Sequence, residues 1–130
     1  MKENLLITVS AAVITNDQGQ LLLVRKKNTD FYMQVGGKLE PNEPPETTII
    51  REIKEEIGVE GSIIKYLGKF HTQAANETGY LLKAYLYEVK ILGNPVACAE
   101  IEDLVWFDPK QHATVPIAPL TAQYVIPLIK

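Results

Sequence analysis

Cysteine is almost absent from this chain, whose 130 residues include only Cys98. A single thiol forms no intramolecular disulfide and no cysteine metal site, so we expect Cys98 to be a small, buried or partly buried apolar side chain. An excess of positive charge is also missing, because 13 Lys and Arg residues face 16 Asp and Glu residues and give a net charge of −3. This balance excludes a general surface for nucleic acid or for an anionic membrane, so positive charge for any phosphate ligand must come from a few local groups.

Long apolar runs are missing as well. The run over residues 5–14 is interrupted by Thr8 and Ser10, is too short to cross a membrane, and lacks the basic region and cleavage site of a signal peptide. We therefore expect a strand here, in a cytoplasmic protein with no membrane partner. The sequence shows no repeat, linker or low-complexity tract, and its length suits a single domain over residues 1–130 with a real core.

What the chain does have is a concentration of carboxylates between residues 37 and 59. Pro44 and Pro45 suit a helix start, where a missing N–H costs least, and Gly58 suits a helix end, so the pattern predicts a helix from Pro44 to Ile57. Four isoleucines fall on one apolar stripe of this helix: Ile49, Ile50, Ile53 and Ile57. Three carboxylates, spaced i, i+3 and i+4, project from a second stripe: Glu52, Glu55 and Glu56.

Two interpretations of this acidic stripe are open on energetic grounds. A solvated charged face is one, since like charges at helical spacing in water cost only about a few tenths of a kcal/mol. In a concave, partly dry site the repulsion grows to roughly several kcal/mol, and a divalent cation would reverse its sign. Such hard oxygen ligands suit Mg²⁺ or Mn²⁺, which usually keep waters and take substrate phosphates as further ligands.

The complete string decides between them, because it resembles the Nudix box at each defining position. The matching positions are Gly37, five residues, Glu43, seven residues, Arg51-Glu52, the aliphatic Ile53, one residue, Glu55-Glu56, one residue, Gly58 and the aliphatic Val59. Asn42 departs from the family pattern, in which a glycine is frequent before this glutamate, and it could change the backbone preferences of the loop.

The resemblance to Nudix hydrolases implies an α/β fold in which a mixed β-sheet lies between helices, with the box over residues 37–59 at one end of the sheet. It also implies hydrolysis of a nucleoside diphosphate linked to a group X, with Mg²⁺ or Mn²⁺ bound by the box. Water would attack one phosphorus in line and expel the other phosphate group. No covalent intermediate is needed.

The same resemblance implies roles for individual residues. Glu52, Glu55 and Glu56 would be metal ligands, and the carbonyl of Gly37 would add another. Arg51 would hydrogen-bond carboxylates so that they point inward, and Glu43 would support the helix. The residue that removes the proton from the attacking water would be Glu55 or a loop glutamate. Glu100, with Glu102 as its competitor, would be an additional metal-binding or base glutamate.

The elements around the box are expected to complete the sheet. Residues 7–14 and 21–24 are predicted to be two strands paired in a hairpin through the turn at residues 16–19. Residues 63–72 and 80–90 are predicted to be two later strands, and residues 118–129 a closing helix that Pro127 bends or ends. Trp106 is expected in the core.

Substrate contacts are predicted outside the box. Arg25 and Lys26 either belong to a solvated loop or meet substrate phosphate, and Gly36-Gly37 allows close backbone approach. The loop over residues 73–79 could overhang the site, so Asn76 and Glu77 within it and His71 just before it are candidates for base or sugar contacts. The first hypothesis for the substrate is a nucleoside triphosphate, including an oxidised one such as 8-oxo-dGTP, and the alternative is ADP-ribose or another sugar nucleotide. A non-catalytic nucleotide-binding module is the hypothesis from another class, and a homodimer is a plausible assembly.

Overall fold

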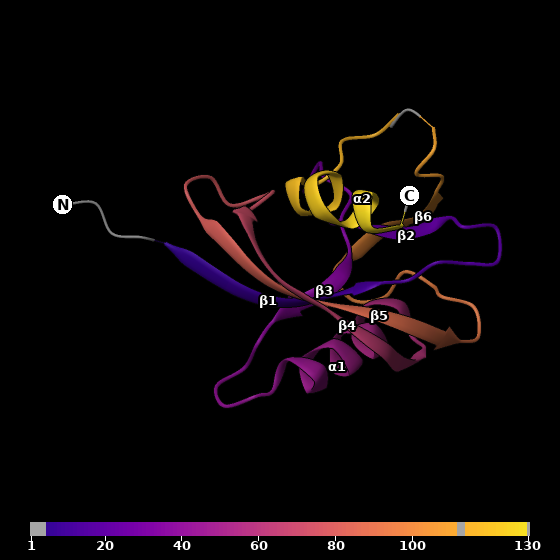
Figure 1. Cartoon of the computed structure of the whole chain (residues 1–130), viewed down its shortest axis with the longest axis horizontal. Helices are drawn as coiled ribbons and strands as arrows, with labels where there is room; N and C mark the ends of the chain where they lie inside the picture. The colour runs from indigo at the N-terminus through magenta and orange to yellow at the C-terminus, as the bar shows by residue number, and fades with distance from the viewer. Residues whose placement is uncertain (1–4, 112–113, 130) are drawn as a thin grey trace.

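The computed structural model describes residues 5–111 and 114–129. A four-stranded sheet of order β3-β1-β5-β4 and a two-stranded sheet of β2 and β6 form the fold. In Figure 1, α1 lies below the larger sheet and the C-terminal helical segment lies above it, so the predicted arrangement of a mixed sheet between helices is confirmed. The elements are β1 (Leu6–Val13), β2 (Leu21–Lys26), β3 (Val35–Lys38), α1 (Pro45–Ile57), β4 (Glu60–Gln73), β5 (Leu81–Leu92), β6 (Ile101–Phe107), η1 (Thr121–Val125) and α2 (Ile126–Ile129).

Strand β1 is covered on both faces, as its sequence predicts. Ala12 belongs to the core on the α1 side, whereas Ala11 and Val13 belong to the core on the η1 side. The strand pairs antiparallel with β3 and parallel with β5, so it forms the centre of the sheet. This position brings β3, with its two glycines, to one edge.

The predicted hairpin between residues 7–14 and 21–24 is wrong. The turn forms, because Gly19 N–H donates to the Asn16 carbonyl at 3.0 Å, but only an isolated bridge between Thr15 and Leu21 continues it. Beyond that bridge β2 leaves β1 and pairs antiparallel with β6. The physical reason is burial on both faces: Leu22 and Val24 enter the core on the α1 side, and their neighbours enter the other core. A strand with two apolar faces is most stable between layers.

Helix α1 begins and ends as the sequence predicts, to within one residue. Pro44 occupies the N-cap and Pro45 the first turn. Gly58 adopts φ 71° and donates its N–H to the Lys54 carbonyl at 3.1 Å, which glycine does without the steric cost of a Cβ. Ile49, Ile53 and Ile57 are fully buried, and burial of each contributes about 1.5–3 kcal/mol. The opposite stripe of the helix is thereby held toward β3.

The C-terminal helical segment departs from the simple helix predicted for residues 118–129. Residues 121–125 form a π-turn in which the Ile126 N–H donates to the Thr121 carbonyl. Pro127 has no N–H, so the helix loses a normal bond at this point and the wider turn accommodates the loss. Trp106, expected in the core, is half-buried against the cluster under α1. No helix in residues 5–111 or 114–129 is long and apolar enough to cross a membrane.

Candidate active site

The site is built where the Gly36-Gly37 backbone meets helix α1. A Cβ on Gly36 would lie 2.1 Å from the Ser10 carbonyl oxygen, and a Cβ on Gly37 would lie 2.5 Å from the carboxyl carbon of Glu52. Both positions therefore require glycine for close approach, the first to the neighbouring strand and the second to a carboxylate. The loop after β3 then turns through Asn42, whose φ of 63° lies in the left-handed region that asparagine tolerates better than most residues.

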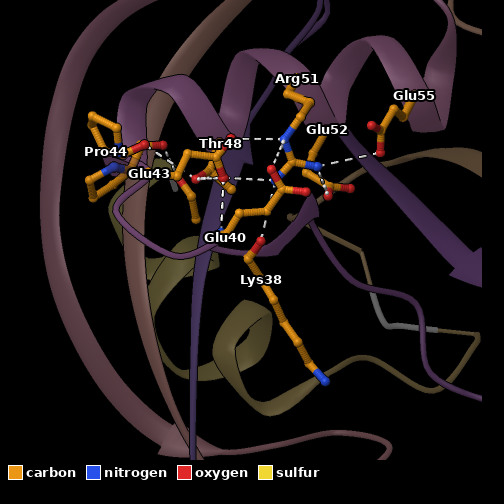
Figure 2. A network of polar contacts seen from close by, with 10 residues as sticks. Lys38, Glu40, Glu43, Pro44, Thr48, Arg51, Glu52 and Glu55 are labelled. Atoms are coloured by element: carbon orange, nitrogen blue, oxygen red, sulfur yellow. Dashed lines mark hydrogen bonds and ion pairs between the residues drawn. The ribbon is translucent and has the colours of Figure 1, made fainter.

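Arg51 organises the carboxylates along the outer face of α1, as Figure 2 shows. Its Nε and Nη2 donate to the two carboxylate oxygens of Glu43 at 2.9 and 2.8 Å, a bidentate contact. Its Nη1 donates to Glu52 at 2.9 Å and lies 3.6 Å from an oxygen of Glu55. The hydrogen bonds from Arg51, with a further one from the Thr48 hydroxyl, lower the pKa of Glu43 to about 2.

Glu56 points the other way, into the protein. Its side chain is buried and accepts a hydrogen bond from the Gly36 N–H at 3.1 Å. Its pKa is raised to about 7, mainly by burial and to a smaller extent by the charges of Glu52 and Glu55, against the opposing effects of the Gly36 N–H and the Lys26 ammonium. Burial likewise raises the pKa of Glu52, although Arg51 opposes this shift. A buried carboxylate beside two others is costly unless cations balance it.

The donor chemistry of this helix face fits a hard divalent cation, since it consists of carboxylate oxygens. Within the described residues, however, no three His, Cys, Asp or Glu side chains converge closely enough to hold a metal ion as they stand. The reason is visible in the contacts: Arg51 engages Glu52 and Glu55, while Glu56 is turned toward Gly36.

A cleft with a cavity volume of about 160 Å³, open to solvent, begins at the two glycines. This volume is smaller than that of a typical small-ligand site, about 300–1,000 Å³. The walls come from β1, the loop after β2, the loop between β4 and β5, and the segment before η1. Much of the lining is apolar: Ile7, Val9, Ala11, Met33, Ala74, Ala75, Leu82, Ala118 and Leu120.

The structure brings several of the predicted substrate residues to this cleft. Lys26, Asn76 and Glu77 line it, together with Lys38. The charge of Lys26 also acts on Glu52 and Glu56, lowering the pKa of each, so this ammonium lies on the side of the acidic helix.

Other predicted residues lie elsewhere. The Arg25 guanidinium stacks over the Tyr32 ring at 5.8 Å and donates to the Thr29 carbonyl at 2.9 Å. Glu100 is exposed just before β6, where its carbonyl accepts the Lys27 N–H at 2.8 Å. His71 is exposed on β4.

Sequence reasoning missed a buried polar pair at this cleft, Gln34 and Thr121. The Thr121 hydroxyl donates to the Gln34 side chain at 2.7 Å, and Gln34 lines the cleft. The signal in the sequence that could have indicated this pair is that each of the two residues is polar within a largely apolar segment.

Comparison with known proteins decides the family. A model of the NUDIX domain matches residues 5–127 of this chain. The chain belongs to the Nudix family. This Nudix protein is 28% identical over 117 residues to the CTP pyrophosphohydrolase of Escherichia coli K12, a match covering 88% of this chain and 84% of that protein.

Solved structures agree with this assignment. The solution structure of the E. coli ORF135 protein is 29% identical, with a TM-score of 0.72 over 97% of this chain and 87% of that chain. The crystal structure of a MutT NUDIX hydrolase from Burkholderia pseudomallei shares the fold, at 24% identity, a TM-score of 0.75 and 95% coverage of both chains. The family and enzyme class predicted from residues 37–59 are confirmed: this is a Nudix hydrolase, a pyrophosphohydrolase. Nudix hydrolases generally use divalent metal ions.

Proposed function

We propose that this Nudix hydrolase cleaves a nucleoside triphosphate, with Mg²⁺ or Mn²⁺, by attack of water on a phosphorus. The observation that carries the proposal is the cleft itself, in which Gly36, Gly37, Lys26 and Lys38 adjoin a largely apolar compartment. Phosphates suit the first part and a flat base suits the second. An oxidised base such as that of 8-oxo-dGTP belongs to the same substrate class.

The metal would be held by Glu52, Glu55 and Glu56, with the Gly37 carbonyl as a further oxygen ligand. When bound, a divalent ion neutralises phosphate charge and lowers the pKa of coordinated water. Glu100, which lies outside the helix, is the proposed additional carboxylate. Glu56, which is buried at the inner end of the set, gives the ion an anchor that solvent screens only weakly.

The protein's own side chains provide the remaining parts of the reaction. Arg51 fixes Glu52 and Glu55 from outside through contacts of 2.9 and 3.6 Å. Lys26, which faces the acidic helix from the cleft, is assigned to substrate phosphate, and Asn76 and Glu77 to the base or sugar. Glu55 is the most exposed of the three helix carboxylates and is held least closely, so it is the proposed acceptor of the water proton. In-line attack then breaks the bond to the departing phosphate group.

The proposal is tested with a panel of nucleoside triphosphates, 8-oxo-dGTP, ADP-ribose and UDP-sugars, with Mg²⁺ or Mn²⁺, measuring released phosphate and pyrophosphate. Glu56→Gln should lower kcat/KM by about 100-fold or more, because the anchor loses its charge. Glu60→Gln is the matched control, since this glutamate is exposed and pairs with Lys54 at 2.9 Å. Unchanged activity in Glu56→Gln would refute the metal assignment.

The panel also separates the alternatives. Preference for ADP-ribose or a UDP-sugar would move the chain to the sugar-nucleotide class. Nucleotide-dependent thermal stabilisation without turnover under either metal would indicate a binding module. We keep one domain over residues 1–130, a cytoplasmic location and a homodimer as predictions, the last to be checked by sedimentation.

A further inference from the structure

Gln34 and Thr121 form a buried polar contact beside the cleft. Gln34 is 5% exposed and Thr121 is 0% exposed. The Thr121 hydroxyl donates to Oε1 of Gln34 at 2.7 Å, and Nε2 of Gln34 donates to the Ala12 carbonyl at 3.2 Å. Gln34 also lines the cleft beside Gly36 and Gly37. Gln34 therefore borders the cleft while its carboxamide is held by the protein.

The two contacts fix which end of the carboxamide is which. The Ala12 carbonyl can only accept a hydrogen bond, so the amide nitrogen must face it. The oxygen must then face Thr121, whose hydroxyl donates. If the amide turned over, the Gln34 oxygen would face the Ala12 carbonyl oxygen at 3.2 Å, and neither oxygen would have a donor there. Unsatisfied acceptors are costly in a buried site.

The π-turn secures Thr121 in this role. Its carbonyl accepts the Ile126 N–H across the wide turn, and its neighbours Leu120 and Val125 are packed in the core. The threonine backbone is thus held independently of its hydroxyl. π-turns inside helices are frequent at functional sites.

Beyond its contacts with Ala12 and Thr121, the fixed carboxamide keeps one N–H and one lone pair for which residues 5–111 and 114–129 supply no hydrogen-bond partner. Cytosine and adenine present an amino donor beside a ring acceptor, whereas uracil and guanine present a carbonyl acceptor beside a ring N–H. These two patterns run in opposite order along the base edge. An amide that can turn over satisfies both patterns, but an amide fixed at both ends satisfies only one.

We propose that Gln34, fixed by Thr121, is a specificity-determining residue that selects between amino bases and keto bases of the nucleotide. The inference rests on the proposed function, because the base must occupy the apolar part of the cleft. Met33, Leu82 and Leu120 line that part and suit the faces of a ring. Thr121 acts as a positioning residue through Gln34.

The test compares ATP, CTP, GTP and UTP by kcat and KM with Mg²⁺, and by Kd in calorimetry without metal. Wild type should favour CTP and ATP together, or UTP and GTP together, by about tenfold or more within each purine or pyrimidine pair. Thr121→Val should reduce these ratios to within about threefold, because the Gln34 oxygen then loses its buried donor and the carboxamide is held only by its 3.2 Å contact with the Ala12 carbonyl, and Thr121→Ser should preserve them. Gln34→Met should raise KM for the favoured pair by about tenfold.

Thr72→Val is the matched control, because Thr72 donates to Gln123 at 2.8 Å in an exposed contact outside the cleft. Its ratios should equal those of wild type. The inference is overturned if the wild-type enzyme separates purine from pyrimidine nucleotides instead of amino from keto bases. It is also overturned if both Thr121→Val and Gln34→Met keep the wild-type ratios of kcat/KM and Kd. If Thr121→Val fails to fold, Gln34→Met decides alone. Absence of turnover with normal Kd ratios would reject the proposed hydrolysis and leave the base selection supported.

Discussion

Alanine at Gly36 and alanine at Gly37 should damage this enzyme in different ways, although the residues are adjacent. The new Cβ of Gly36→Ala would lie 2.1 Å from the Ser10 carbonyl oxygen and 2.9 Å from the Ala11 Cα. Both are backbone atoms of β1 and cannot swing aside. The two strands must separate by about 1 Å or more, and such overpacking costs about 1–3 kcal/mol or more.

The new Cβ of Gly37→Ala meets a side chain instead. It would lie 2.5 Å from the carboxyl carbon of Glu52, about 1 Å short of ordinary contact. That carboxylate is the end of a flexible side chain and can move, so little stability is lost. A displacement of about 1 Å at a reacting centre can nevertheless cost about 100-fold in rate.

Thermal unfolding and steady-state kinetics on the best nucleotide of the panel separate the two defects. Gly36→Ala should lower Tm by about 5–15 °C. Gly37→Ala should keep Tm within about 2 °C of wild type and lower kcat/KM by about 100-fold. A larger loss of stability in Gly37→Ala than in Gly36→Ala, or full activity in Gly37→Ala, would refute the reasoning.

Three further outcomes are expected. Lys26→Gln should raise KM for the nucleotide about tenfold with a smaller effect on kcat, whereas Arg25→Gln, which loses the stack over Tyr32, should lower Tm and change KM much less. Glu43 has a folded-state pKa of about 2 against an ordinary value of 4.5. Its contribution to stability is therefore present above pH 4.5 and is lost as the pH falls toward 2. The midpoint of urea unfolding should depend less on pH over this range in Glu43→Gln than in wild type. Mn²⁺ at about 100 times its Kd should stabilise wild type by about 2.7 kcal/mol in thermal unfolding and should fail to stabilise Glu56→Gln.

The acidic helix could be predicted from sequence because its information is local. Residues three and four apart on a helix share a face wherever the helix lies, so Glu52, Glu55 and Glu56 were predicted on one stripe without knowledge of the fold. Their contacts differ in the structure, because Arg51 engages Glu52 and Glu55 whereas Glu56 is turned toward Gly36. The bounds of α1 followed for the same reason, since prolines and glycine act on their own backbone.

Strand pairing could not be predicted in the same way. The turn at residues 16–19 indicates a reversal of the chain, but whether two strands then stay paired depends on layers formed by distant segments. Leu21 through Val24 are buried on both faces, which favours a partner such as β6, about 80 residues later.

The sequence also could not tell that Lys26 lines the cleft while Arg25 does not. The β2–β6 register shifts between these two residues, so simple alternation along the strand does not predict which side chain reaches the cleft. The contact between Gln34 and Thr121 spans 87 positions of the chain, and neither residue belongs to a local pattern. Both features depend on tertiary packing.

Helix α1 carries its buried isoleucines and its carboxylates on two different stripes of the same few turns. One inserted or deleted residue inside Pro45–Ile57 would rotate everything beyond it by about 100°. Glutamates would then enter the core and isoleucines would face the substrate, so folding and catalysis would fail together. The loop over residues 73–79 does not combine a core with a set of carboxylates in this way, because it supplies only a wall of the cleft. New specificities should therefore arise from changes in loop length, while the length of the helix stays constant.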